Sequence, residues 1–334
     1  MKALVLNATD GLQSVELKEV EQPVPKAGEV RVALRAASLN HRELWIALGQ
    51  YPNMIAPPFT LGCDGVGIIE AVGDGVAATR IGEEVILHPS LHWGDDHRFP
   101  AAGFGTLGMP GPGTIAEHIA LPAENALSKP AHLSFEQAAA IPLAALTAWR
   151  GLFTKAGLRV GEKVLITGIG GGVAIFALQF AVAYGAEVYV TSGSDETIAK
   201  AIELGAKAGF NYKDEGWRKA LPKTSGGIDV VFDGAPASSY PNYGRALNMG
   251  ARVVVYGSTA GINFPVNAPE LFLKNVNIMG TNVGDLEDFT AMLAFVNEKQ
   301  LTPVIERQFT LADAKAALQY LKDAHGFGKV VITI

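Results

Sequence analysis

A glycine-rich segment between two apolar runs constrains the fold of this chain more than any other feature. Residues 164–167 form a short β-branched run typical of a buried parallel strand, and apolar side chains recur with helical spacing over residues 173–181. Four of the five residues 168–172 are glycine. Such a turn lets a phosphate approach the backbone, and it leads into a helix N-terminus whose free N–H groups favour an anion. The segment therefore predicts a binding site for the pyrophosphate of a dinucleotide.

The sequence after this turn continues the alternation of strands and helices. Further strands are expected at residues 187–191, 228–232 and 252–256, and a helix at residues 195–204. This order is typical of an α/β fold with a doubly wound parallel sheet, in which ligands bind beyond the carboxyl ends of the strands. Glycine-rich turns also occur for packing reasons alone, but this context favours nucleotide binding.

The length and composition favour a globular protein of two domains. The chain has 334 residues and a net charge of -6, and it carries no basic region that would indicate nucleic acid as a partner. No apolar run is long enough to span a membrane, and the N-terminal residues do not resemble a secretory signal. Cys63 is the only cysteine, which excludes an internal disulfide and fits a cytoplasmic protein.

The first 90 residues are expected to form a small barrel or a partly open β domain. Gly, Pro and Asp turns separate short strand-like runs in the first 90 residues, at residues 1–6, 30–36, 67–72 and 84–87. The glycine-dense residues 62–75 predict a strand with a bulge, a tight bend or a close backbone approach. Near the C-terminus the expected elements are strands at residues 277–280 and 329–333 and helices at residues 285–299 and 312–321.

Four segments carry a resemblance to a known family. In their order and spacing, residues 40–57, 62–67, 142–149 and 168–172 resemble the medium-chain dehydrogenase/reductase superfamily, over essentially the full length of the chain. The chain looks most like the zinc-free quinone oxidoreductase branch and the proteins called zinc-type alcohol dehydrogenase-like.

The resemblance implies a fold and an assembly. A GroES-like, β-rich catalytic domain would comprise residues 1–128 together with 268–334. A Rossmann domain, residues 129–267, would be inserted between the two parts and bind the dinucleotide. Relatives commonly pair through the nucleotide domain, so a homodimer or homotetramer is expected.

The same resemblance allows a test for zinc. Zinc-dependent relatives use a Cys, a His-Glu pair and a further Cys or His; aligned on the acidic residue, this chain has Asn40, Cys63-Asp64 and Leu143 there. One thiolate does not make a three-ligand zinc site. Residues 88–113 contain three histidines but none of the four closely spaced cysteines of the family's structural zinc lobe. We therefore expect no metal site.

Without a metal, the protein must position the nicotinamide ring and stabilise charge on the substrate oxygen. Thr147 resembles the family residue that contacts the nicotinamide region, although it is also suited to be a packing hydroxyl. Asn40 has an amide that can donate to a carbonyl oxygen, and a turn residue is an equally good interpretation. His41 has a pKa suited to proton delivery near neutrality, with a surface helix position as the alternative.

The end of the strand at residues 187–191 should decide between NAD and NADP. The acidic residue that binds the ribose of NAD is missing there, and Asp195 comes later, as the expected N-cap of the next helix. Small hydroxyls with a nearby Lys and Tyr favour the 2′-phosphate of NADP(H), although Thr197 stands where relatives more often have Lys. The expected cofactor-binding residues are Gly168, Gly170, Gly171, Gly172, Val173, Ser192, Ser194, Lys200, Tyr212, Gly234, Gly257 and Ser258.

These observations predict a zinc-independent, NADPH-dependent oxidoreductase. The missing metal favours an acceptor that is already electrophilic, such as a quinone, an α,β-unsaturated carbonyl or a related carbonyl. Two alternatives stay open. One is a zinc-dependent alcohol dehydrogenase, and the other is an NADPH-binding protein with little turnover that acts as a redox sensor or a structural protein.

Overall fold

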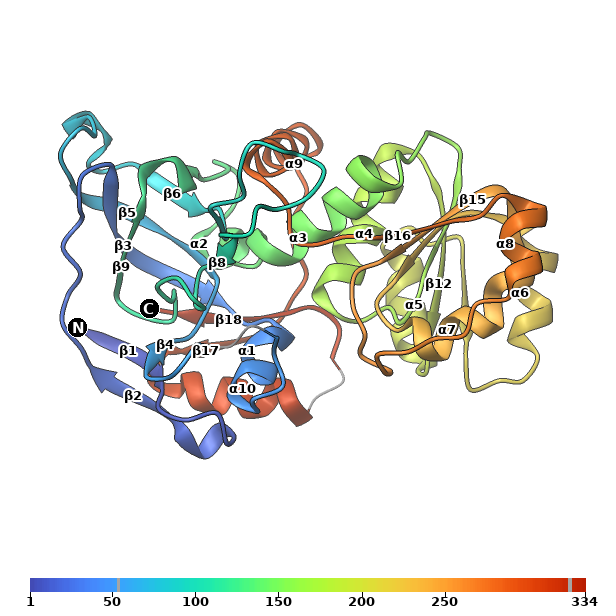
Figure 1. Cartoon of the computed structure of the whole chain (residues 1–334), viewed down its shortest axis with the longest axis horizontal. Coiled ribbons are helices and arrows are strands. Elements are labelled where there is room, and N and C mark those ends of the chain that lie inside the picture. Colours follow the sequence, from blue (N-terminus) through green and yellow to red (C-terminus); the bar gives the residue numbers. More distant parts are fainter. Residues whose placement is uncertain (53–54, 324–325) are drawn as a thin grey trace. The chain divides into compact units, whose positions relative to one another are not determined.

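The computed structural model describes residues 1–52, 55–323 and 326–334. The chain forms two compact units. Figure 1 shows the chain with colours that follow the sequence. We call Met1–Ala144 and Gly284–Ile334 the terminal unit, and Ala145–Val283 the inserted unit. The terminal unit therefore takes its residues from both ends of the chain.

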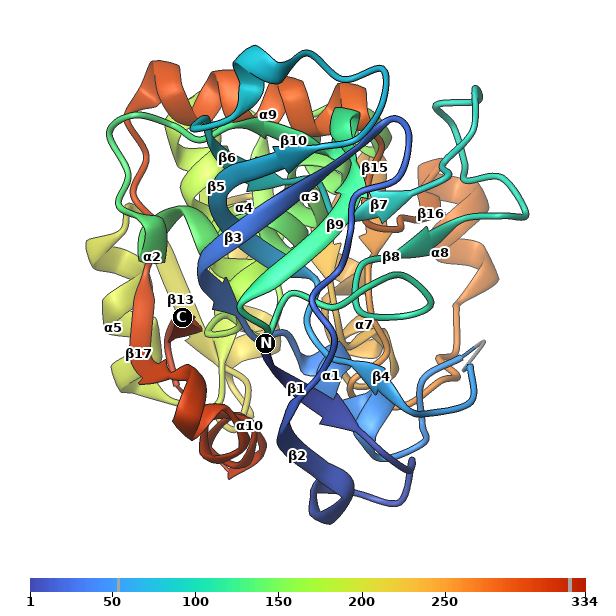
Figure 2. The ribbon, with the colours of Figure 1, turned by 90° about the vertical axis from the view of Figure 1, so that its left-hand side faces the viewer.

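The largest sheet of the terminal unit joins N-terminal and C-terminal strands (Figure 2). Its strands are β3 (Glu29–Ser38), β5 (Asp64–Val72), β6 (Glu84–Leu87), β9 (His118–Pro122), β10 (Ala126–Ser128), β17 (Ile305–Thr310) and β18 (Lys329–Thr333). They are hydrogen-bonded in the order β10-β6-β5-β3-β18-β17, and β9 also pairs with β3. β18 runs antiparallel to β3 and parallel to β17, so the last strand of the chain completes a sheet that the N-terminal residues begin.

Smaller sheets and helices complete the terminal unit. β1 (Lys2–Leu6) pairs with β2 (Val15–Glu19) and β4 (Phe59–Thr60), and β7 (Ser90–Leu91) pairs with β8 (Gly105–Thr106). The helices are α1 (His41–Ala47), α2 (Phe135–Ala139), α9 (Leu286–Lys299) and α10 (Ala314–Asp323), with 3-10 turns η1 (Leu12–Ser14), η2 (Ala78–Arg80), η3 (Ala123–Asn125) and η6 (Leu311–Asp313). α1 packs against α10, and Ile46 and Leu318 share one buried core with Leu6 and Ile332.

The glycine-dense strand β5 has a close backbone approach and a register shift at Gly67. A Cβ at Gly67 of β5 would lie 2.1 Å from the Ala33 carbonyl oxygen of β3. The register between these strands shifts next to this point, between Leu34 and Ala36. Gly67 therefore lets two strands approach each other, and the partner in this approach is backbone of the same sheet.

The inserted unit is built around a parallel sheet with strand order β13-β12-β11-β14-β15-β16. The strands are β11 (Lys163–Ile166), β12 (Glu187–Ser192), β13 (Ala208–Asn211), β14 (Ile228–Asp233), β15 (Leu247–Val255) and β16 (Asn277–Gly280). The helices are α3 (Pro142–Trp149), the π-helix η4 (Arg150–Lys155), α4 (Gly172–Tyr184), α5 (Asp195–Glu203), α6 (Trp217–Ser225), α7 (Pro236–Tyr243), the 3-10 turn η5 (Gly244–Ala246) and α8 (Ala268–Lys274). The residues of the central strands β11, β12 and β14 are mostly apolar and buried, as expected for a parallel sheet that helices flank on both faces. The order reverses between β11 and β14, which is the switch point where such folds bind ligands.

The two units divide later in the chain than the boundaries near residues 128 and 267 that the sequence predicts. α2 packs on β3 and β5, so the residues that precede α3 belong to the terminal unit. β16 extends the parallel sheet by pairing with β15, so residues 268–283 belong to the inserted unit. Tertiary packing and strand pairing move both boundaries, and neither is visible in local composition. Among the described residues, no helix is long and apolar enough to cross a membrane.

Candidate functional site

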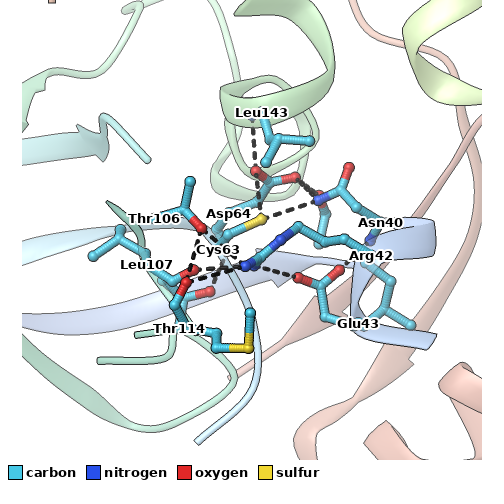
Figure 3. A network of polar contacts seen from close by, with 12 residues as sticks. Asn40, Arg42, Glu43, Cys63, Asp64, Thr106, Leu107, Thr114 and Leu143 are labelled. Atoms are coloured by element: carbon cyan, nitrogen blue, oxygen red, sulfur yellow. Dashed lines mark hydrogen bonds and ion pairs between the residues drawn. The ribbon is translucent and has the colours of Figure 1, made fainter. Parts of the chain in front are cut away.

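A buried polar cluster in the terminal unit brings together residues that are far apart in the sequence (Figure 3). The Asp64 carboxylate, at the start of β5, is inaccessible to solvent. Its Oδ2 accepts hydrogen bonds from Ser38 Oγ and from Asn40 Nδ2, both at 2.7 Å. Its Oδ1 accepts a hydrogen bond from the backbone N–H of Leu143 at 2.8 Å. Asp64 therefore connects β3, β5 and the segment at the start of α3.

The cluster also contains a buried cation, the ammonium of Lys329 at the start of β18. Its Nζ lies 2.6 Å from Asn40 Oδ1, 2.8 Å from the Leu39 carbonyl oxygen and 3.1 Å from Asp64 Oδ2. These contacts match the three N–H donors of an ammonium group. Since the Lys329 side chain is only 4% exposed, the protein replaces nearly all of its hydration. A buried ion pair of this kind is tolerated because both groups are also hydrogen-bonded to neutral partners.

Helix α1 begins inside this cluster. Asn40 is its N-cap residue, and Glu43 Oε2 accepts the Asn40 backbone N–H at 2.8 Å. Burial raises the pKa of Glu43, and the charge of Arg42, 3.1 Å away, opposes this shift. Arg42 is itself buried and donates to Thr106 Oγ1 at 2.8 Å and to the Leu107 carbonyl oxygen at 3.0 Å. The first turn of α1 thus fixes both Asn40 and the loop after β8.

The three positions that the resemblance aligns with zinc ligands come together in the structure. Asn40 Nδ2 lies 3.4 Å from Cys63 Sγ, and the backbone of Leu143 contacts Asp64 from the other side. Burial raises the pKa of Cys63 well above its ordinary value, so its thiol stays protonated near neutral pH. Within residues 1–52, 55–323 and 326–334, no group of three or more His, Cys, Asp or Glu side chains is arranged to hold a metal ion.

Two of the three predicted catalytic residues lie in the terminal unit. The Asn40 amide donates to Asp64 and Cys63, so each of its two amide hydrogens has a protein partner. His41 follows it as the first residue of α1 and is exposed. Burial by surrounding protein atoms and, to a smaller extent, the Lys329 charge lower the pKa of His41, which favours the neutral imidazole. Thr147 lies in the part of α3 that belongs to the inserted unit, and it is 7% exposed.

The predicted glycine turn connects β11 to α4. Gly168 and Gly170 have φ angles of 63° and 140°, which favour glycine, and Gly171 is the N-cap before Gly172 and Val173. A Cβ at Gly168 or Gly171 would meet no atom within 4 Å. Free space therefore lies in front of the turn, next to a helix end whose first N–H groups have no intrahelical partner. This cradle fits the pyrophosphate of a dinucleotide.

The hydroxyl groups predicted to hold the ribose lie at the end of β12. Ser194 is the N-cap of α5, and its Oγ accepts the Thr197 N–H at 3.3 Å. The expectation that Asp195 is this cap is wrong, because Ser194 already supplies the acceptor one residue earlier. Ser192 Oγ accepts the Ser194 N–H at 3.2 Å. Each hydroxyl oxygen thus accepts a hydrogen bond from a backbone N–H, and its own O–H remains able to donate.

The other predicted ribose contacts flank these serines. The Tyr212 N–H donates to the Ser192 carbonyl oxygen at 3.0 Å, and a Cβ at Gly193 would lie 2.6 Å from the Tyr212 hydroxyl. Lys200 is exposed on α5 and pairs with Glu196 at 2.7 Å. Tyr212 therefore lies close to Ser192, whereas Lys200 has a carboxylate partner on its own helix.

The loops after β14 and β15 pack closely against each other. A Cβ at Gly234 would lie 2.7 Å from the Tyr256 ring, and a Cβ at Gly257 would lie 3.1 Å from the Gly234 carbonyl oxygen. Ser258 follows on the exposed side of this contact. The glycines therefore have a packing reason to be present in addition to the predicted cofactor role.

Lys329 and Ser38 belong to the polar cluster but are not among the residues that the sequence predicts. A signal for Lys329 exists, since it begins a strand whose following residues 330–332 are apolar and buried. A charged side chain in such a run is rarely buried unless it is paired. No comparable signal marks Ser38, because serine is common at strand ends.

Taken together, a parallel sheet with a glycine turn at its switch point and a β-rich unit with a polar cluster define a nicotinamide-dependent oxidoreductase. Family comparisons agree. The model described as zinc-binding dehydrogenase matches residues 172–298, and the alcohol dehydrogenase GroES-like domain matches residues 26–131.

Individual relatives cover nearly the whole chain. A zinc-type alcohol dehydrogenase-like protein of Leptosphaeria maculans is 36% identical, over 96% of this chain and 94% of its own length. A quinone oxidoreductase of Rattus norvegicus is 30% identical, over 100% and 98%. A crystal structure of an NAD-dependent alcohol dehydrogenase superposes with a TM-score of 0.94 at 35% identity, covering 100% of both chains. The chain belongs to the medium-chain dehydrogenase/reductase superfamily, whose members use a nicotinamide cofactor.

Proposed function

We propose that this chain is a zinc-independent, NADPH-dependent oxidoreductase that reduces a quinone, an α,β-unsaturated carbonyl or a related carbonyl. One observation carries the proposal. The positions aligned with zinc ligands hold an amide, a protonated thiol and a leucine, and the nearby carboxylate of Asp64 is neutralised by the Lys329 ammonium. A zinc ion requires deprotonated ligands, and here it would also meet a buried cation.

The contacts of Asn40 support a role for its amide in the substrate site. Lys329 and Asp64 hold the Asn40 amide in one orientation, with its oxygen on the ammonium and its nitrogen on the carboxylate. The Asn40 contact to Cys63 Sγ is long, at 3.4 Å, and sulfur is a weak acceptor. A substrate oxygen competes well for this hydrogen, so we assign Asn40 to stabilising developing charge on that oxygen.

The other two predicted residues receive narrower roles. We assign Thr147 to contact with the nicotinamide, on the family resemblance and its nearly buried position in α3. We assign His41 to the rim of the substrate site. Its lowered pKa favours a neutral imidazole that relays a proton from water. A bound nicotinamide supplies the hydride, and the protein supplies orientation and electrostatics.

The preference for NADPH over NADH rests on the end of β12. No carboxylate occupies the position after Thr191, and the Ser192 and Ser194 hydroxyls keep donors for a phosphate. The similar crystal structure of an NAD-dependent alcohol dehydrogenase favours the opposite assignment. Fluorescence titration with both reduced cofactors decides the question, and we expect the dissociation constant of NADPH to be lower.

The test of the proposed function combines metal analysis with a turnover screen. Purified protein should contain no stoichiometric zinc, and it should oxidise NADPH with quinones or enones at a rate that a chelator leaves unchanged. Zinc whose removal abolishes activity would establish the zinc-dependent alcohol dehydrogenase instead. Tight NADPH binding without oxidation by any acceptor would establish the low-turnover sensor or structural protein.

We further propose a cytoplasmic homodimer or homotetramer in which the terminal unit binds the substrate and the inserted unit binds the cofactor. Support for the assembly comes from the edge of the parallel sheet, where β16 has a neighbour on one side only among the strands that the structure describes. Near this edge, α8 exposes two large apolar side chains, Phe272 and Leu273, both at 66%. Light scattering should give the mass of a dimer or tetramer, and Phe272→Asp should shift it towards the monomer.

A further inference from the structure

A second fully buried carboxylate, Asp233, lies at the carboxyl end of β14 in the inserted unit. Its Oδ1 accepts hydrogen bonds from Thr167 Oγ1 at 2.6 Å and from the Ala235 N–H at 2.9 Å. Its Oδ2 accepts them from Ser239 Oγ at 2.5 Å and from the Tyr243 hydroxyl at 2.8 Å. In the described part of the chain, these neutral donors fill the roughly four acceptor sites of a carboxylate.

The donors come from elements that meet at the switch point of the sheet. Thr167 directly follows β11 and directly precedes Gly168, the first glycine of the turn. Ala235 belongs to the loop after β14, and Ser239 and Tyr243 lie on α7. One carboxylate therefore joins the start of the glycine turn to the neighbouring loop and to the helix behind that loop.

Backbone hydrogen bonds extend this connection to a third loop, after β15. The Tyr256 N–H donates to the Asp233 carbonyl oxygen at 3.0 Å. The Thr259 N–H and Oγ1 both donate to the Gly234 carbonyl oxygen, at 3.1 Å and 3.0 Å. The loops after β11, β14 and β15 thus form one hydrogen-bonded assembly centred on Asp233 and Gly234.

The glycine turn is anchored on its other side as well. The Gly168 N–H donates to Thr191 Oγ1 at 3.1 Å, and the Ile169 N–H donates to the Thr191 carbonyl oxygen at 2.8 Å. Ile169 is the one residue of the turn with a side chain, and it is buried, whereas Gly168 and Gly171 leave free space in front of them. The position of the turn depends on the bonds of Thr167 to Asp233 and of the turn to Thr191.

We propose that Asp233 is a positioning residue for the dinucleotide: by holding the Thr167 hydroxyl, it fixes the glycine turn relative to the two following loops. A carboxylate suits this role because it only accepts hydrogen bonds, so the surrounding hydroxyl groups all point towards it. The inference rests on the proposed function in one respect, the assignment of the nicotinamide cofactor to these loops. Asp233 itself is buried and acts through Thr167.

A pair of matched variants tests the proposal. Thr167→Val and Ser239→Ala each remove one hydroxyl donor to Asp233, from opposite carboxylate oxygens, and only Thr167 leads into the glycine turn. In a fluorescence titration with NADPH, we expect Thr167→Val to raise the dissociation constant roughly tenfold. This is the change that the loss of about one net hydrogen bond would cause. Ser239→Ala should leave the constant within about threefold of the wild type.

Equal effects of the two variants would overturn the proposal, since they would show a general loss of packing, and so would the absence of any effect. A wild-type protein that binds neither NADPH nor NADH would instead overturn the proposed function. The melting temperatures of the two variants, measured without cofactor, should fall by similar amounts, which separates cofactor positioning from stability.

A second pair separates the geometry of the carboxylate from its charge. Asp233→Asn keeps one oxygen for Thr167 and Ala235, and its N–H groups face the Ser239 and Tyr243 hydroxyls, which are able to accept. We expect Asp233→Asn to bind NADPH within about threefold of the wild type, whereas Asp233→Ala should weaken binding roughly tenfold or more. Equal losses in both variants would contradict a positioning role.

Discussion

Asp64 in the terminal unit and Asp233 in the inserted unit are both inaccessible to solvent, yet they are stabilised in different ways. The Asp64 carboxylate faces a buried ammonium, Lys329 at 3.1 Å. The hydrogen-bond donors that the structure describes around Asp233 are all neutral: hydroxyl groups and a backbone N–H. The protein thus stabilises the Asp64 carboxylate with a charged partner and the Asp233 carboxylate with hydroxyl groups and a backbone N–H.

The difference matches what each site is proposed to do. The opposite charges of an ion pair compensate each other. Each partner therefore needs the other, because a lone buried charge is costly. A set of neutral donors leaves the carboxylate replaceable by an amide and can connect several loops at once. Charge pairing therefore suits a cluster that is proposed to work without a metal, and hydroxyl donors suit a junction that is proposed to hold loops in register.

The largest effect is expected from breaking the ion pair on one side only. Lys329→Met leaves the Asp64 carboxylate buried without a cation, and Asp64→Asn leaves the ammonium without an anion. Each should cost about 3–5 kcal/mol of stability. Hydrogen exchange of peptides from β3, β5 and β18 measures this locally, which avoids assuming two-state unfolding of a protein with two units.

The double variant Asp64→Asn/Lys329→Met is the control for this prediction. Since no uncompensated charge remains, most of the lost stability should return. A double variant as unstable as the sum of the single variants would show that the two charges do not stabilise each other.

The next prediction is that acid destabilises the terminal unit more than the inserted unit. Burial lowers the pKa of His88 to about 4, from an ordinary value of 6.5. The unfolded chain therefore binds a proton on His88 at a higher pH than the folded chain does. Stability from neutral His88 is fully present above pH 6.5 and is lost as the pH falls through 4, by an amount on the order of 3 kcal/mol.

The inserted unit has no histidine in residues 145–283, so it should not lose stability through this route. Hydrogen exchange at several pH values between 7 and 4 should show earlier opening of the terminal unit. His97 titrates in the opposite sense, because its bond to Asp285 raises its pKa, but solvent screens this interaction since the His97 side chain is 63% exposed. In His88→Gln the difference between the units should shrink, and an unchanged difference would assign it to other groups.

A smaller effect distinguishes two glycines of the cofactor turn. Gly168 has a φ of 63°, so Gly168→Ala should cost about 1–2 kcal/mol of stability and also fill the cradle. Gly171 has a φ of -76°, so Gly171→Ala should fill the cradle without backbone strain. Thermal unfolding and NADPH titration should show that both variants bind more weakly and that only Gly168→Ala melts earlier. Unchanged NADPH affinity in both would indicate that the dinucleotide does not bind at this turn.

The smallest effect completes the comparison of the carboxylates. Asp233→Asn should destabilise the inserted unit by only about 1 kcal/mol, because hydroxyl groups adapt to an amide by rotating. Measured by the same hydrogen exchange method, this loss should be several times smaller than that of Asp64→Asn. Equal losses would mean that an ammonium and a set of hydroxyl groups stabilise buried carboxylates equally well.

Much of the fold is predictable from the sequence because apolar runs and glycine turns act locally. The strands at residues 84–87, 277–280 and 329–333 have the predicted bounds, and the glycine turn joins a strand to a helix as expected. The unit boundaries were not predictable in the same way. They depend on α2 packing against β3 and on β16 pairing with β15, which local composition does not reveal.

The candidate site is predictable only in part. The resemblance aligns Asn40, Cys63 and Leu143 with zinc-ligand positions, and the structure brings these residues together around Asp64. Lys329 escapes prediction because 265 residues separate it from Asp64. Its role becomes evident only when β18 is known to lie next to β3.

The position of Lys329 in the final strand also has a consequence for how the chain is made. Synthesis proceeds from the N-terminus, so the ribosome completes Asp64, and then the entire inserted unit, before the ammonium that neutralises Asp64 exists. Residues 145–283 are contiguous and free to fold as soon as they emerge. The terminal unit must instead wait for Lys329, so its polar cluster can form only after β18 has emerged and paired with β3.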